Sequence, residues 1–154
     1  MAGTTASILL VEDDDLVARA VARALRRAGF AVTSAASLKA AHAATGPFRC
    51  AVLDLDLPDG SGDDLASRLL AGGIVPCVVF FTGSANVHVL QAAARLGPVV
   101  GKSEGTGRLI EVLIEVLAET LESGVAPVDS ENGAPAVDLP DELRGSGRGS
   151  RRTQ

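Results

Sequence analysis

Residues 52–62 read Val52-Leu53-Asp54-Leu55-Asp56-Leu57-Pro58-Asp59-Gly60-Ser61-Gly62, an apolar run that passes into a turn rich in acids and glycine. The apolar run begins at Phe48 and stops at Leu53, and a short apolar run bounded by turn signals is typical of a fully buried strand. Asp54 follows at once, so its carboxylate is expected at the carboxyl edge of a sheet, where open α/β folds keep their sites. We therefore predict a strand that delivers a carboxylate to a surface crevice.

Apolar runs and helix-like segments alternate five times along the chain. Strands are predicted at residues 8–11, 30–34, 48–53, 75–81 and 99–100. Helices are predicted at residues 16–28, 37–45, 63–71, 85–96 and 106–122. This alternation indicates an α/β fold, with parallel strands joined by right-handed crossovers and helices on both faces of one sheet. Continuous rather than alternating apolar strands agree with a sheet that is covered on both sides.

Capping and periodicity predict where the helices begin and which faces they bury. Asp14 or Asp15 can cap the first helix, Gly29 can end it in the left-handed conformation, and Ser84 can cap the fourth helix. The last helix is expected to pack through one apolar face, formed by Leu109, Ile110, Leu113, Ile114, Leu117 and Leu121.

Composition excludes several functional classes. The 154 residues are 47% hydrophobic but only 3% aromatic, which predicts an aliphatic core. A net charge of -5 argues against direct nucleic-acid binding by the domain as a whole. No apolar run approaches the roughly 18 residues that a membrane span requires, and the first residues do not resemble a signal peptide. We expect no membrane association and a cytoplasmic location.

The chain is expected to divide into three segments. Residues 1–6 are a flexible start, residues 7–123 are one folded domain, and residues 124–154 are a tail that is first acidic and proline-rich and then basic and rich in Gly and Ser. The tail cannot bury enough apolar surface to offset its ordering entropy, so we predict disorder. A basic RNA- or membrane-binding tail is the alternative, and its cations are Arg144, Arg148, Arg151 and Arg152.

The two cysteines and two histidines carry no recognisable chemical motif. Cys50 and Cys77 lack metal-ligand spacing and are interpreted as two buried, reduced thiols. His42 and His88 are interpreted as surface or packing residues rather than ligands.

Polar side chains of distinct kinds follow four of the five predicted strands. Glu12 and Asp13 follow the first strand, Asp54 the third, Thr82 the fourth and Lys102 the fifth. The flavodoxin-like strand order 2-1-3-4-5 would bring these ends together at its switch point. Three carboxylates in one crevice repel each other, so a cation is expected there, and a few oxygen ligands suit Mg²⁺. Carboxylate, Mg²⁺, lysine and hydroxyl together indicate phosphoryl transfer in which a carboxylate can be the nucleophile.

These motifs resemble the receiver domain of two-component response regulators, of the single-domain type. The resemblance rests on residues 8–14, residues 52–62, the sequence Phe80-Phe81-Thr82-Gly83 and the pair Gly101-Lys102, and it covers about residues 7–122. It implies a flavodoxin-like (βα)5 fold with a doubly wound, five-stranded parallel sheet in the order 2-1-3-4-5. It also implies a signalling phosphoacceptor rather than an enzyme.

The resemblance implies a role for each site residue. Asp54 is the phosphorylated aspartate, and it shares a Mg²⁺ ion with Asp13, with Glu12 through water, and with the backbone carbonyl of Asp56. Two further residues, Thr82 and Lys102, hold the phosphoryl group.

Partners follow from the same resemblance. A histidine kinase or a histidine phosphotransfer protein donates the phosphoryl group. The output is contact with an unidentified downstream protein, or a phosphorylation-dependent homodimer through the fourth helix, fifth strand and fifth helix.

The sequence departs from the family pattern around Lys102 and beside Asp54. Ser103 follows the lysine where the family usually has proline, and Val100 stands where an aromatic residue is common. The segment from residue 97 to residue 102 is short, and Asp56 adds a further carboxylate.

Two alternatives remain open. The departures motivate a pseudo-receiver, which would act as a constitutive interaction module without phosphorylation. A haloacid-type hydrolase also uses an aspartate nucleophile, although its acidic motif closes the first strand rather than the third.

Overall fold

The sheet has the predicted order and direction. In the computed structural model, which describes residues 5–122, five parallel strands are hydrogen-bonded in the order β2-β1-β3-β6-β7. These strands are β1 (Ser7–Val11), β2 (Ala31–Ala35), β3 (Cys50–Leu53), β6 (Val78–Thr82) and β7 (Val99–Gly101). The strand order 2-1-3-4-5 and the flavodoxin-like architecture are thereby confirmed.

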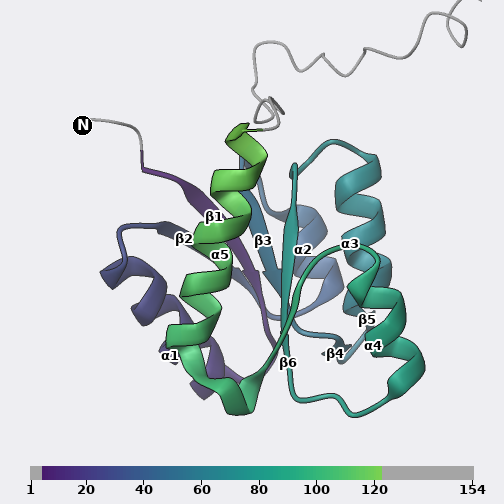
Figure 1. The fold of residues 1–154 in the computed structure, drawn as a ribbon. Coiled ribbons are helices and arrows are strands. Elements are labelled where there is room, and N and C mark those ends of the chain that lie inside the picture. The colour runs from purple at the N-terminus through teal and green to yellow at the C-terminus, as the bar shows by residue number, and fades with distance from the viewer. Residues whose placement is uncertain (1–4, 123–154) are drawn as a thin grey trace, which may run out of the picture.

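Helices cover both faces of this sheet, as Figure 1 shows. The helices are α1 (Asp15–Arg27), α2 (Leu38–Ala43), α3 (Gly62–Ala71), α4 (Val87–Ala94) and α5 (Gly105–Glu122). The helices α1 and α5 lie on one face, and α2, α3 and α4 lie on the other. A turn of 3-10 helix, Lys102–Glu104, leads into α5.

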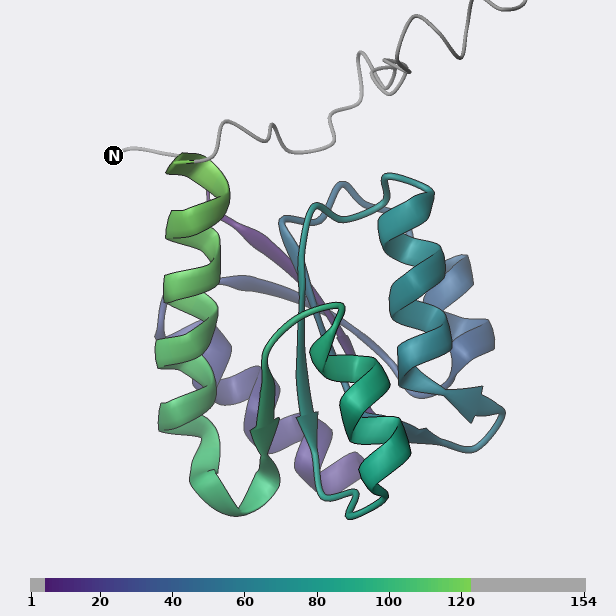
Figure 2. The ribbon, with the colours of Figure 1, turned by 45° about the vertical axis from the view of Figure 1, so that its right-hand side comes forward.

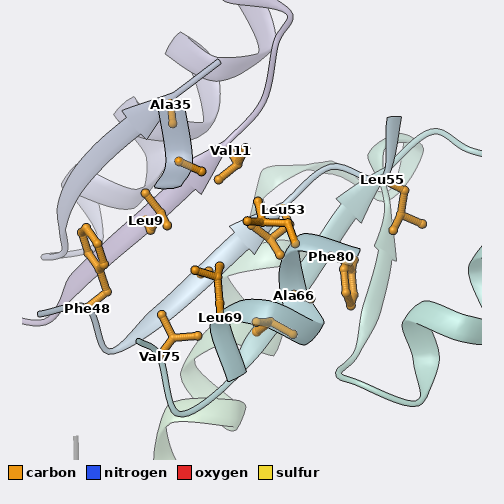
Figure 3. Close-up of a cluster of buried hydrophobic side chains, with 14 of the residues drawn as sticks. Leu9, Val11, Ala35, Phe48, Leu53, Leu55, Ala66, Leu69, Val75 and Phe80 are labelled. Carbon is orange, nitrogen blue, oxygen red and sulfur yellow. The ribbon is translucent and has the colours of Figure 1, made fainter. Parts of the chain in front are cut away.

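Each face of the sheet supports its own aliphatic core. Alternate residues of β1 point in opposite directions, so Leu9 packs towards α2 and α3, whereas Ile8 packs towards α1 and α5. Figure 3 shows the first cluster, in which Leu9, Leu53 and Phe80 converge from three adjacent strands. Full burial of one such side chain contributes about 1.5–3 kcal/mol, so the two clusters account for much of the stability.

Two predicted helix starts have different outcomes. Asp14 is the residue that caps α1, because its carboxylate accepts hydrogen bonds from the backbone N–H groups of Leu16 and Val17. The predicted cap at Ser84 is wrong. The helix α4 begins two residues later, where Asn86 accepts from the N–H groups of the first turn, and the Ser84 hydroxyl instead accepts from the Asn86 N–H.

The predicted apolar face of α5 is partly wrong. Ile114 and Leu121 are 52% and 61% exposed, whereas Val112, which was not predicted, is buried. The buried stripe follows Leu109, Val112 and Leu113, so the helix is rotated relative to the predicted face. An outer helix that touches the sheet along one narrow line cannot bury an apolar face as wide as the sequence offers.

A two-stranded hairpin follows β3, where only a turn was predicted. It pairs β4 (Asp56–Leu57) with β5 (Gly60–Ser61), and strands of two residues are too short to leave a periodic signal. The Asp59 carboxylate in its turn accepts hydrogen bonds from the N–H groups of Leu38 and Lys39 at 2.8 and 3.1 Å. The hairpin therefore also caps the start of α2, alongside the N-cap residue Ser37, whose hydroxyl accepts from the Ala40 N–H.

The predicted terminal segments largely fall outside the described residues. Residues 1–4 and 123–154 are outside, so the flexible start and the predicted tail remain predictions. The end of α5 and the start of β1 lie at the same end of the molecule (Figure 2). Within residues 5–122, no helix has both the length and the apolar character needed to cross a bilayer.

Candidate functional site

The candidate site lies at the carboxyl ends of the central strands. Two backbone hydrogen bonds extend the ladders past the strand ends: the Glu12 N–H donates to the Ala35 carbonyl, and the Asp54 N–H donates to the Val11 carbonyl, both at 3.0 Å. Parallel neighbours end at one edge of a sheet, so these bonds fix both acids side by side.

Three carboxylates meet at this edge. Glu12, Asp13 and Asp54 each offer an oxygen, and these oxygens all lie within 4.8 Å of one another. Glu12 and Asp54 are each 4% exposed, whereas Asp13 faces solvent. Burial raises the pKa of Glu12, and hydrogen bonds from Lys102 and from the Asp14 N–H oppose that rise. The cluster therefore combines like charge with low solvation, which favours binding of a cation.

Lys102 bridges the two buried acids. Its Nζ lies 2.9 Å from Glu12 Oε1 and 2.9 Å from Asp54 Oδ2. Burial lowers the pKa of Lys102, and the hydrogen bonds to Asp54 and Glu12 raise it, so that the net direction is upward. The lysine therefore remains a cation held against the acids, despite the serine that follows it.

The turn after Lys102 is held by a residue that sequence reasoning missed. The Glu104 carboxylate accepts a hydrogen bond of 2.8 Å from the Gly101 N–H, within the short 3-10 helix. This contact fixes the chain on both sides of the lysine, where the family usually has proline. The sequence did contain a signal for this contact, the glutamate two residues after the lysine. A glutamate in the first turn of a helix can accept a hydrogen bond from the backbone N–H of the residue that precedes the helix.

Neighbouring backbone groups orient the Asp54 carboxylate. The Asp56 N–H donates to Asp54 Oδ1 at 3.3 Å, while Asp54 Oδ2 accepts from Lys102. A Cβ atom at Gly62 would lie 2.0 Å from the Asp54 carbonyl oxygen, so only glycine lets α3 begin this close to the site. Sequence reasoning had placed Gly62 only in the turn. The Asp56 side chain is exposed, and its main-chain N–H is the part that touches Asp54.

Thr82 ends β6 beside the lysine-bearing strand. It is 2% exposed and pairs in register with Gly101, the residue before Lys102. Its Oγ1 accepts a hydrogen bond of 3.1 Å from the Ser84 N–H. The hydroxyl hydrogen can therefore be donated to another oxygen at the sheet edge.

Val99 and Val100 of β7 lie on opposite faces of the sheet. The Val100 side chain packs with the cluster under α1 and α5, whereas Val99 packs against the cluster on the opposite face, which α2, α3 and α4 cover. The residue that faces α4 is Val99, because successive side chains of a strand alternate between faces.

The site fits a hard divalent cation better than a soft one. Every candidate side-chain ligand is a carboxylate oxygen, and Mg²⁺ binds through few protein carboxylates while it retains waters. The exposed Asp13 leaves one side of the group open to water and to a phosphoryl group.

Comparison with known sequences gives one consistent result. The sequence model described as the response regulator receiver domain matches residues 8–113. The acid tolerance regulatory protein ActR of Rhizobium meliloti (strain 1021) is 32% identical over 133 residues, which are 84% of this chain and 69% of ActR. The photosynthetic apparatus regulatory protein RegA of Rhodovulum sulfidophilum is 34% identical over 97 residues, or 62% of this chain and 53% of RegA.

Solved structures agree on the fold. A receiver domain protein (CheY-like) from Methanospirillum hungatei JF-1 superposes with a TM-score of 0.71 at 24% identity, covering 78% of this chain and 99% of that one. The non-phosphorylated HemR receiver domain from Leptospira biflexa has a TM-score of 0.66 at 28% identity, covering 73% and 94%. The chain therefore belongs to the receiver domain family of two-component response regulators.

Proposed function

We propose that this receiver domain accepts a phosphoryl group on Asp54. The observation that carries the proposal is the arrangement around this carboxylate: it is buried beside Glu12, near Asp13, and held by the Lys102 ammonium at 2.9 Å. Receiver domains are signalling proteins rather than classical enzymes. The chemistry of this chain is then limited to its own phosphorylation and dephosphorylation.

The acidic group would hold Mg²⁺ during the transfer. Asp13 and Asp54 would be direct ligands, the Asp56 carbonyl would be a third, and Glu12 would act through water. Bound Mg²⁺ supplies shielding between the anionic carboxylate and the incoming phosphoryl group. The open, exposed side of the group at Asp13 leaves room for that approach.

Lys102 and Thr82 would hold the transferred group. The Lys102 ammonium already contacts Asp54, so it would pair with a phosphoryl oxygen once Asp54 is phosphorylated. The Thr82 hydroxyl would donate to a second oxygen. Thr82 is the last residue of β6, and Lys102 follows directly after β7, the neighbouring strand. Both side chains would therefore lie close to the negative charge of a phosphoryl group on Asp54.

The donor would be a histidine kinase or a histidine phosphotransfer protein, and the output would be protein contact. The surface of α4, β7 and α5 is the proposed output surface, either for a downstream protein or for a second copy of the chain. Val87 of α4 is 59% exposed there, and Ile114 of α5 is 52% exposed. Size-exclusion chromatography with and without phosphorylation tests the homodimer, and an unchanged elution volume would remove it.

Phosphoryl incorporation is the direct test. The full chain, incubated with acetyl phosphate and Mg²⁺, is expected to gain the mass of one phosphoryl group, and the gain should disappear when the metal is chelated. Asp54→Asn is expected to abolish the gain. The matched control, Asp64→Asn, changes an exposed acid of α3 and should retain it.

The pseudo-receiver alternative predicts the opposite result. A constitutive interaction module would show no gain of mass and no binding of Mg²⁺ in a titration. Its motivation was the unusual sequence after Lys102, yet this lysine contacts both Asp54 and Glu12. This contact supports the phosphoacceptor over the alternative.

A further inference from the structure

The opposite edge of the sheet carries two thiols that the proposed function does not use. Cys50 is the first residue of β3, and Cys77 immediately precedes β6. These two strands are parallel neighbours, with Ala51 opposite Val78, so one residue earlier Cys50 lies opposite Cys77. The Ala51 N–H donates to the Cys77 carbonyl, which fixes this pairing. Both side chains pack against the same cluster under α1 and α5, so they share one face.

This placement brings the sulfur atoms within reach of each other. Neighbouring strands lie about 4.8 Å apart, and disulfides join residues whose Cα atoms lie roughly 4.4–6.8 Å apart. Cys77 precedes the first regular residue of β6, so its backbone can adjust more readily than a residue inside the strand. The two thiols are therefore positioned for a cross-strand bond.

The two sulfurs differ in chemical character. The neighbouring Cys50 thiol lowers the pKa of Cys77 to about 7, partial burial opposes this, and Thr120 and Arg49 lower it further. As a thiol, Cys77 donates a hydrogen bond of 3.4 Å to the Arg49 carbonyl, and Cys50 donates one of 3.6 Å to the Ala51 carbonyl. Burial raises the pKa of Cys50 well above its usual range. Cys77 is partly exposed and Cys50 is fully buried. Cys77 thus has the properties of an attacking thiolate. Cys50, on the neighbouring strand, has those of a protonated thiol that can react with an oxidised Cys77.

We propose that Cys50 and Cys77 form a redox-active dithiol, which a peroxide oxidises to an intramolecular disulfide. The Cys77 thiolate attacks one peroxide oxygen, the O–O bond breaks, and the sulfenic acid of Cys77 and hydroxide are formed. The Cys50 sulfur then attacks the Cys77 sulfur, the S–O bond breaks, and the Cys50 proton leaves with the departing oxygen as water. The two thiols lose two electrons, and hydrogen peroxide is reduced to two waters.

The disulfide would join the two strands that lead to the acidic site. β3 runs from Cys50 towards Asp54, and β6 runs from the residue after Cys77 to Thr82. Oxidation would thus join the amino ends of β3 and β6. The carboxyl ends of the same two strands carry Asp54 and Thr82. The proposal does not depend on the phosphorylation of Asp54, since the dithiol can be tested without metal or phosphodonor.

Oxidation of the full chain tests the proposal. After treatment with hydrogen peroxide, the monomer is expected to lose the mass of two hydrogen atoms, both thiols should resist alkylation, and dithiothreitol should restore them. A non-reducing digest should yield one peptide pair that joins Cys50 to Cys77. Two thiols that remain open to alkylation, or Cys77 oxidised to sulfinic acid beside an intact Cys50 thiol, would overturn the proposal.

Two variants assign the roles. Cys50→Ala is expected to stop at the sulfenic acid of Cys77, which dimedone traps, whereas Cys77→Ala should leave Cys50 unoxidised. The alkylation of Cys77 in the wild-type chain should be half-maximal near pH 7 and should move to higher pH in Cys50→Ala. Equal alkylation profiles in the two proteins would contradict the role of Cys50 in lowering the pKa of Cys77. If either variant fails to fold, the wild-type peptide map decides alone.

Discussion

At the scale of single residues, the site is a balance between three acids and one lysine. Lys102 neutralises part of the charge of Glu12 and Asp54, both buried, while Asp13 remains exposed at the rim. Burying two carboxylates beside one cation leaves excess negative charge, and such a site gains from a further cation. The affinity for Mg²⁺ should therefore depend on Asp13, the acid that solvent reaches.

Asp13→Asn is expected to remove the stabilisation that Mg²⁺ gives the wild-type chain. A metal that binds only the folded state, at ten times its Kd, adds about 1.4 kcal/mol to the free energy of unfolding. Urea unfolding with and without excess MgCl₂ measures this difference. The matched control is Asp15→Asn, an exposed acid that pairs with Arg19 on α1, and it should retain the full Mg²⁺ effect. An unchanged Mg²⁺ effect in Asp13→Asn would exclude Asp13 as a ligand.

Sequence reasoning was effective at this scale where position along a strand decides position in space. Glu12, Asp54 and Lys102 could be brought together from the sequence alone, because parallel strands end at a common edge. Glu104 and Gly62 could not, because their roles depend on contacts with backbone atoms that only the folded chain defines.

At the scale of elements, loop residues cap the starts of helices through contacts that the apolar periodicity of the sequence does not predict. The helix predictions succeeded where the apolar stripe is long, as in α1, and failed at the start of α4. Ser84 and Asn86 are both good cap residues, and the choice between them depends on how the chain leaves Thr82. The β4–β5 hairpin was missed because strands of two residues leave no periodic signal, and its hydrogen bonds to the start of α2 exist only in the folded chain.

Asp59→Asn is expected to destabilise the chain at neutral pH but not at low pH. Hydrogen bonds from the N–H groups of Leu38 and Lys39 lower the pKa of Asp59 in the folded state. A carboxyl whose pKa is lowered by folding stabilises the fold above its ordinary pKa, and this stabilisation is lost as pH falls through the lowered value.

The urea midpoint of each protein as a function of pH measures this effect. The difference between wild type and Asp59→Asn should therefore be largest above about pH 4 and should shrink below it. Asp64→Asn, which changes an exposed acid of α3, is the control, and its difference from wild type should not depend on pH in this way. A difference that does not vary with pH would show that the Asp59 carboxylate is not the group that holds α2.

Gly62→Ala is expected to destabilise the chain by about 1–3 kcal/mol, the usual cost of overpacking. The added methyl group would lie 2.0 Å from the Asp54 carbonyl oxygen, so the start of α3 would have to move. Gly107→Ala in α5 is the control, since a Cβ there meets nothing within 4 Å and should stabilise the helix by up to about 1 kcal/mol. Urea unfolding compares the two, and equal effects would contradict the close approach of α3 to Asp54.

At the scale of the whole molecule, the two edges of the sheet carry different chemistry. The carboxyl edge gathers the acids and Lys102, and the amino edge carries Cys50 and Cys77, with β3 and β6 linking them. The helices α2, α3 and α4 cover one face and α1 and α5 the other (Figure 1). Alternation of strands and helices predicted a parallel sheet with both faces covered, and the polar residues at the strand ends favoured the order 2-1-3-4-5.

A chain that ends at residue 123 is expected to have the same free energy of unfolding in urea as the full chain, within about 0.5 kcal/mol. The sequence predicts that residues 124–154 add no core, and residues 5–122 already contain two extensive buried clusters. A chain that ends at residue 113 is the control. It loses Val116 and Leu117, which pack against the α1–α5 cluster, and should be less stable by about 2 kcal/mol or more. A weakened 1–123 chain would show that the tail supports the fold.

The central claim is that Asp54, among the many acids of this chain, accepts the phosphoryl group. Borohydride reduces an acyl phosphate to an alcohol, so it converts a phosphorylated aspartate to homoserine, which a peptide map locates. After treatment with acetyl phosphate and Mg²⁺ and then borohydride, we predict homoserine at position 54, with Asp13, Asp56 and Asp59 unchanged. Homoserine at another position, or at none, would contradict the account.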